Sequence, residues 1–208
     1  RFRYNPTVRS LNAIVPAMIP LLLLLIPAIL SALAVVREKE LGSIVNLYVT
    51  PVTRLEFLLG KQLPYIVIGF VNFIILTLLA VFLLKVPLKG SLPGLALGAL
   101  LYVAAATGYG LLISALTKSQ VAAVFAGAIL SMLPTMQFSG MLQPVSTLEG
   151  GAWLMGTLWP TTYYMHLSVG TFTKGLGFAD LGTDLLALAS FIPVFVLGAA
   201  VLLKKQEA

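Results

Sequence analysis

The chain has 208 residues, of which 59% are hydrophobic and 10% are charged, and its mean hydropathy is +1.02. Soluble domains carry about 25% charged residues, so this composition excludes an ordinary soluble domain and indicates a membrane protein. The net charge of +6 comes from lysines and arginines at the ends of apolar segments, which favours contact with membrane lipid and argues against direct contact with nucleic acid.

Five charge-free apolar segments approach or exceed the roughly 20 helical residues that cross a bilayer core. The first contains three prolines, which membrane helices tolerate because neighbouring helices can satisfy the freed backbone groups. The sequence therefore predicts an all-α polytopic membrane protein with five transmembrane helices, at residues 11–36, 63–84, 92–116, 121–137 and 185–203.

The stretch between the first two predicted spans gathers charged residues that most of the chain avoids. Within it, Leu41, Ile44, Val45 and Tyr48 recur at helical spacing and form one apolar stripe of a short amphipathic helix. Pro51 ends this helix, because the residue before a proline is pushed out of the helical region. The pattern alone is compatible with a helix that covers lipid and with one that docks a cytosolic partner.

A second helix begins directly afterwards and leads into the second span. Thr53 is placed to cap it, and Glu56 occupies the third helical position of a capping box. The helix continues through Gly60 and Lys61. The letters LLGKQ are not a phosphate-binding loop, which needs a glycine five residues earlier and a serine or threonine after the lysine. ATP is therefore expected to bind elsewhere.

The sequence VREKELGSIVNLYVTPVTRLEFLLGKQLPY resembles the segment after the second transmembrane helix of ABC-2 type permeases, the membrane subunits of one class of ATP-driven exporters. SGMLQPVSTLEG and WPTTYYMHLSVGTF are similar to that family's segment before its last helix. The long stretches look closest to the C-terminal membrane portion of the ribosome-associated ABC ATPase. The resemblance covers nearly all of residues 1–208, and the family's first helix and large external domain are lacking.

The resemblance implies that residues 38–48 form a cytosolic coupling helix that meets an ATPase cassette, and that short re-entrant helices on the outer side precede the last span. A cytoplasmic charged stretch also agrees with the distribution of lysines and arginines once Arg1, Arg3 and Arg9 are set aside. The residues expected to couple to the ATPase are Arg37, Glu38, Lys39, Glu40, Leu41, Ile44, Val45 and Tyr48, with Thr53, Glu56, Gly60 and Lys61 forming the helix cap and the start of the second span.

The resemblance further implies a transport module in a bacterial inner membrane, with no catalytic residue, cofactor or metal of its own. ATP and Mg would be bound by ABC nucleotide-binding domains, fused upstream or separate. A second permease half, in a homodimer or pseudo-dimer, would complete the unit. An alternative function is a non-transporting membrane anchor of a ribosome-associated ABC ATPase.

A third function class, an intramembrane hydrolase, stays open if Ser139 and His166 meet in space. His166 is the only histidine, so it has no second imidazole or thiolate with which to form a metal site. Asp180 and Asp184 are four residues apart just before the last span, which favours the solvated start of a helix over acid–base chemistry.

The apolar segment 152–160 is too short to cross a bilayer and too apolar for a freely solvated loop. We expect a short helix that dips into the outer leaflet, with Trp153 and Trp159 as anchors at the membrane interface.

Overall fold

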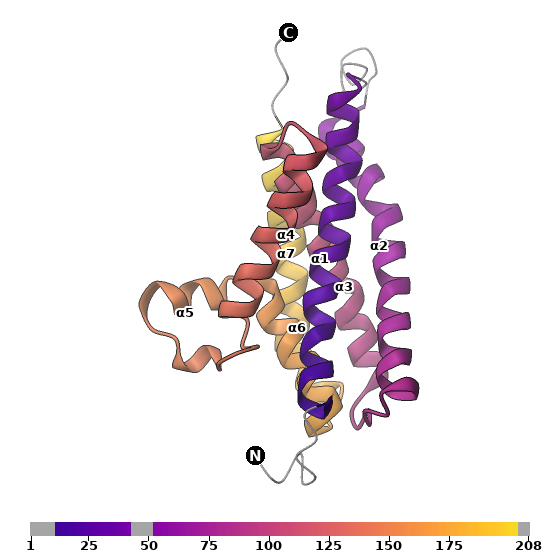
Figure 1. The fold of residues 1–208 in the computed structure, drawn as a ribbon, viewed down its shortest axis with the longest axis vertical. Coiled ribbons are helices and arrows are strands. Elements are labelled where there is room, and N and C mark those ends of the chain that lie inside the picture. The colour runs from indigo at the N-terminus through magenta and orange to yellow at the C-terminus, as the bar shows by residue number, and fades with distance from the viewer. Residues whose placement is uncertain (1–10, 43–51, 204–208) are drawn as a thin grey trace.

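The computed structural model describes residues 11–42 and 52–203, and within these ranges the chain is largely helical and contains no strand. Short π-helical turns at Leu79–Leu83 and Gly170–Lys174 extend the second and sixth helices. The α-helices of these ranges are α1 (Leu11–Glu40), α2 (Arg54–Leu78), α3 (Leu92–Leu116), α4 (Gln120–Phe138), α5 (Gly150–Thr157), α6 (Pro160–Val169) and α7 (Gly182–Leu202), and Figure 1 shows their arrangement.

Five helices are long and apolar enough to cross a membrane: α1, α2 with its π-helical turn, α3, α4 and α7. This confirms the predicted polytopic all-α fold. α3 has the predicted bounds, and Ser91 caps its start by accepting a hydrogen bond from the backbone N–H of Gly94. α1 is longer than predicted, because it continues through residues 37–40 of the charged stretch.

The long helices define two ends of the bundle. At one end, which we call the charged end, α1 stops, α2 starts, α3 stops, α4 starts and α7 stops (top of Figure 1). The turns from α2 to α3 and from α6 to α7 lie at the opposite end, where the backbone N–H of Gly90 donates to the carbonyl of Thr171 at 2.9 Å. The described parts of the charged stretch, residues 37–42 and 52–61, therefore lie at a single end of the molecule.

α3 is the central helix, and it contacts α1, α2, α4, α6 and α7. Glycines on its surface let the neighbouring helices come close, as small residues do in membrane helix packing. A Cβ atom added to Gly110 would lie 2.1 Å from the backbone oxygen of Ala28 in α1, and one added to Gly98 would lie 2.4 Å from Leu167 Cδ1 in α6. The Gly110 contact is with backbone, which cannot turn away.

Prolines in the spans free backbone carbonyls, and hydroxyl groups of neighbouring helices satisfy them. Pro20 has no N–H to donate to the carbonyl of Pro16 one turn earlier, and Ser168 of α6 donates to that carbonyl at 2.8 Å. Tyr109 of α3 does the same, at 3.0 Å, for the carbonyl that Pro134 frees in α4. The spans therefore stay helical through these prolines, as expected for membrane helices.

Buried polar side chains tie α1, α2 and α3 together two to three turns in from the charged end. Ser31 of α1 donates to the backbone carbonyl of Thr107 at 2.9 Å. Gln62 of α2 donates to the carbonyl of Ala104 at 2.8 Å and lies 3.1 Å from the hydroxyl of Thr107. Such hydrogen bonds fix how the three helices are aligned along their lengths, because apolar packing alone distinguishes poorly between neighbouring registers.

α5 and α6 are short helices before α7, at the position predicted for re-entrant helices; their placement on the outer side of the membrane stays a prediction. α5 projects from the bundle, whereas α6 packs against α1, α3 and α7 (Figure 1). Trp153 on α5 is half-exposed, as an interfacial anchor would be. Trp159 is partly buried: its ring packs edge-on against Tyr109 and its Nε1 donates to the Thr135 hydroxyl at 3.1 Å, and its role as an anchor stays a prediction.

Replacing Gly110 with alanine should push α1 away from α3 and lower the free energy of unfolding by about 1–3 kcal/mol, the usual cost of overpacking. Gly182→Ala is the matched control, since a Cβ atom there would meet nothing within 4 Å. The control should be neutral or slightly stabilising, because alanine favours helix over glycine. Thermal unfolding in detergent compares the two variants, and equal melting temperatures would contradict the close helix contact.

Candidate functional site

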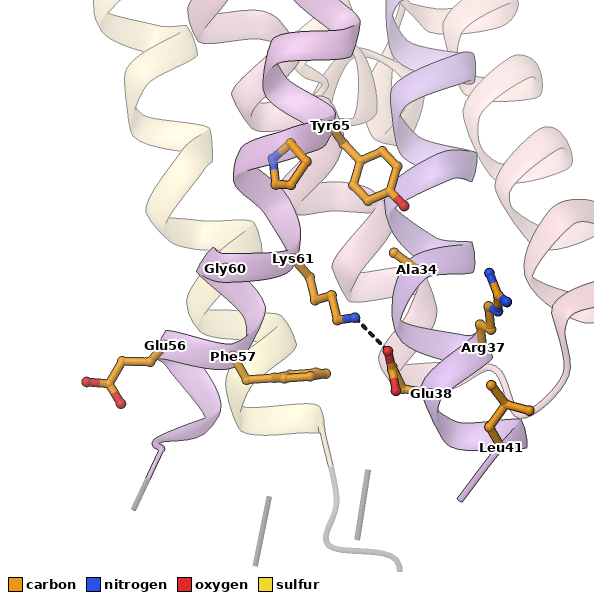
Figure 2. Close-up of a pocket in the computed structure, with 10 residues that line it drawn as sticks. Ala34, Arg37, Glu38, Leu41, Glu56, Phe57, Gly60, Lys61 and Tyr65 are labelled. Carbon is orange, nitrogen blue, oxygen red and sulfur yellow. Dashed lines mark hydrogen bonds and ion pairs between the residues drawn. The ribbon is translucent and has the colours of Figure 1, made fainter. Parts of the chain in front are cut away.

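A cleft opens at the charged end between the end of α1 and the start of α2, with a volume of about 690 Å³. Figure 2 shows how the side chains of both helices surround it. Arg37, Glu38 and Leu41, from the α1 side, are predicted coupling residues. Glu56, Gly60 and Lys61, from α2, are predicted residues of the helix cap and the second-span start, so the two sets share one surface. The remaining lining residues are Ala34, Phe57, Pro64 and Tyr65.

An ion pair crosses this cleft and joins the two helices. Lys61 Nζ lies 2.6 Å from Glu38 Oε1, and the two side chains are 33% and 28% exposed. The ammonium also lies 5.8 Å from the centre of the Phe57 ring. Partly exposed ion pairs contribute roughly 0–1 kcal/mol, so this contact orients the helix ends without locking them together.

Lys39 points away from the cleft and binds the end of α3. Its Nζ donates to the carbonyls of Ser114 and, at 3.2 Å, Thr117, and lies 3.4 Å from that of Ala115. The last carbonyls of a helix have no partner within that helix, and a cation there also interacts favourably with the helix dipole. Lys39 therefore caps α3 from a neighbouring helix.

Glu40 caps the start of α4. Its carboxylate accepts a hydrogen bond from the backbone N–H of Gln120 at 2.8 Å and another from the Gln120 side-chain amide. An anion is favoured at a helix N-terminus, where backbone N–H groups lack partners. The two adjacent charges Lys39 and Glu40 thus fix the turn between α3 and α4 to the end of α1.

The capping box predicted at the start of α2 is confirmed. Thr53 accepts a hydrogen bond from the backbone N–H of Glu56, and the Glu56 carboxylate accepts one from the backbone N–H of Thr53 at 2.8 Å. Arg54, which sequence reasoning did not single out, donates to the backbone carbonyl of Leu203 at 3.1 Å. It thereby ties the end of α7 to the start of α2.

The predicted coupling helix, residues 38–48, needs a correction at its start. Residues 38–40 belong to the last turn of α1, and the chain then turns through the exposed Leu41 and through Gly42, whose φ of +73° favours glycine. A separate helix over these residues is excluded because the hydrogen bonds of α1 continue to Leu41. Ile44, Val45 and Tyr48, which complete the predicted apolar stripe, lie outside the described residues.

A second group of polar side chains lies toward the opposite end of the bundle. His166 of α6 and Asp184 of α7 approach to 2.7 Å between Nδ1 and Oδ2, and Asp184 is buried. The prediction of a solvated Asp184 is therefore wrong. Sequence reasoning missed the pair because it depends on how α6 packs against α7. In the described ranges no group of three or more histidine and acidic side chains is placed to hold a metal ion.

Ser139 lines the same cavity as this pair, which bears on the hydrolase alternative. Its hydroxyl donates to the backbone carbonyl of Thr135, one turn earlier in α4. No hydrogen bond joins Ser139 to His166, and a serine nucleophile needs such a contact with its base. The geometry therefore gives the hydrolase no support.

The sequence matches the family described as ABC-2 family transporter protein over residues 2–201. The probable multidrug ABC transporter permease YbhS of Escherichia coli strain K12 is 31% identical over 84% of this chain and 46% of its own length. The probable multidrug ABC transporter permease YbhR of the same strain is 28% identical over 88% of this chain and 48% of its own length. The chain thus spans about half the length of the curated relatives it matches, and no solved structure matches it.

Lys39→Met should lower the free energy of unfolding by about 1–3 kcal/mol, because it leaves carbonyls at the end of α3 without their charged donor. Arg37→Met removes the same charge two residues earlier, where the described residues provide no hydrogen bond, and should be nearly neutral. Thermal unfolding and the abundance of both variants in the membrane test this difference. Equal losses would show that charge at this end, and not capping by Lys39, stabilises the bundle.

Proposed function

Since this chain belongs to the ABC-2 family of transporter proteins, we propose that it is the transmembrane permease module of an ATP-driven exporter. Partner nucleotide-binding domains would bind ATP and Mg and carry out the hydrolysis, and this chain would perform no covalent chemistry. A second permease half would complete the pathway, as it does in this family. The special relation to a ribosome-associated ATPase stays a prediction.

The observation that supports this proposal is the cleft between α1 and α2, where the predicted coupling residues Arg37, Glu38 and Leu41 face the start of the second span across the segment 43–51. Force applied to that segment by an ATPase domain would reach the ends of α1 and α2 first. The ion pair between Glu38 and Lys61 is weak enough to exchange when these ends move. Lys39 and Glu40 would then transmit the motion of α1 to α3 and α4, whose ends they cap.

The proposal places the charged end in the cytoplasm, and two lysines that flank α3 test this. Lys118 and Lys89 are exposed at opposite ends of a helix about 37 Å long. The chain has no cysteine, so Lys118→Cys and Lys89→Cys each introduce a single label site. A membrane-impermeant thiol reagent added to intact cells should label position 89 and leave position 118 unlabelled until the cells are opened. The reverse pattern would overturn the orientation.

Ile44→Asp tests the coupling role itself. Fully burying one aliphatic side chain is worth about 1.5–3 kcal/mol, so a carboxylate in the predicted stripe should weaken docking to the ATPase domain. In the complete transporter we expect normal membrane abundance, lost transport and ATPase activity that no longer responds to substrate. Asn46→Asp is the control, because it adds the same charge on the opposite face of the predicted helix and should retain transport.

Two outcomes separate the proposed function from its alternatives. If Ile44→Asp transports normally, the segment does not dock the ATPase and the coupling role is wrong. If the unaltered complex shows no transport and no substrate-stimulated ATPase activity in liposomes, the chain is an anchor for its ATPase and not a permease.

A further inference from the structure

The His166–Asp184 pair lies in the wall of a second cavity, of about 540 Å³, between the end of α4, α6 and the start of α7. Small-molecule sites in proteins commonly measure about 300–1,000 Å³ and combine apolar walls with a few polar groups. This cavity fits that description, because Pro144, Val145, Met165 and Val169 supply apolar surface beside the charged residues. It is remote from the cleft at the charged end and shares no lining residue with it.

The charged lining of the cavity consists of His166, Lys174 and Asp184. The hydrogen bond to Asp184 raises the pKa of His166, while partial burial and the positive charge of Lys174 act against that rise. The position of Asp184 in the first turn of α7 also favours its negative charge. With His166 protonated, two cations face one carboxylate and leave one net positive charge.

The side-chain hydrogen-bond donors of the cavity that have no partner among the described residues belong to cationic groups. Asp184 occupies Nδ1 of His166, and the half-exposed ring keeps its Nε2 without a partner among the described residues. The exposed ammonium of Lys174 likewise has no carboxylate partner in these residues. Hydroxyl groups around the cavity, in contrast, donate within the protein: Ser139 to Thr135, Thr162 to Gly156 and Tyr163 to Thr157.

We propose that this cavity binds an amphiphilic anion, whose phosphate, sulfate or carboxylate group meets His166 and Lys174 and whose apolar part lies against Val145, Met165 and Val169. Charge-assisted hydrogen bonds from an imidazolium and an ammonium recognise such groups. Asp184 is a positioning residue, because it holds the imidazole in the orientation and charge state that binding needs. The anion could come from a lipid headgroup or from a free amphiphile, since both carry the same chemistry.

The single histidine of the chain provides a direct readout. The protein would be labelled with ¹³C and ¹⁵N in histidine only, placed in phosphatidylcholine nanodiscs and titrated with decyl phosphate while the ring resonances are followed by NMR. We expect a saturable shift and a higher pKa of His166, because a bound anion favours the imidazolium. Decyltrimethylammonium, which has the same chain and the opposite charge, should give neither effect.

Lys174→Gln should weaken the binding of decyl phosphate about fivefold, the effect of losing one exposed charge partner. Lys85→Gln is the control, because it removes an exposed lysine from the same end of the bundle but outside the cavity. Asp184→Asn should lower the pKa of His166 in the free protein, which reports the positioning role independently of ligand. Equal weakening by Lys174→Gln and Lys85→Gln would overturn the assigned site.

Further additions identify the source of the anion. A shift with phosphatidylglycerol in the nanodiscs supports a membrane lipid, and a shift with decyl phosphate alone supports a free amphiphile. If inorganic phosphate binds as tightly as decyl phosphate, the apolar walls contribute nothing and the amphiphile proposal is wrong. It is equally wrong if decyl phosphate and decyltrimethylammonium shift His166 alike.

Discussion

The structure depends on one constraint, which is that backbone carbonyls at helix ends and before prolines need donors where little water reaches them. α3 ends in such carbonyls, and Lys39 of α1 reaches them. This explains why α1 continues beyond its apolar segment into the charged stretch. The same need accounts for Ser168 at the carbonyl freed by Pro20 and for Arg54 at the end of α7. Polar side chains are few in this chain, and many of them donate hydrogen bonds to such carbonyls.

The charged stretch therefore combines two roles that its sequence does not separate. Lys39, Glu40 and Arg54 are occupied within the chain, where they cap neighbouring helices. Arg37 and Leu41, in contrast, line the cleft from the end of α1 (Figure 2). A partner that docks at the charged end would meet the second group. Substitutions in the first group would act through contacts inside the bundle, so a loss of transport there is not evidence of contact with an ATPase.

Local features of the sequence were predictable and non-local ones were not. The spans follow from long apolar segments, and the capping box of Thr53 and Glu56 follows from residues three apart, so both were predicted correctly. α6 is short and mixes polar with apolar residues, so its sequence shows no clear hydrophobic periodicity from which its buried face could be predicted. The burial of Asp184 depends on His166, which α6 brings to it from another part of the sequence. The partners of Lys39 are likewise set by the packing of α1 against α3.

α1 lines the cleft at the charged end and contacts α6, which lines the cavity at the opposite end. It forms one wall of the cleft at the charged end, and near its other end the Pro16 carbonyl accepts the hydroxyl of Ser168 in α6. A helix of 30 residues is about 45 Å long, so this one element connects the two ends of the bundle. If α1 shifts, α6 must follow or leave a buried carbonyl without a donor, at a cost of about 1–3 kcal/mol. Because α6 carries His166, motion at the cleft would reshape the cavity at the opposite end of the bundle.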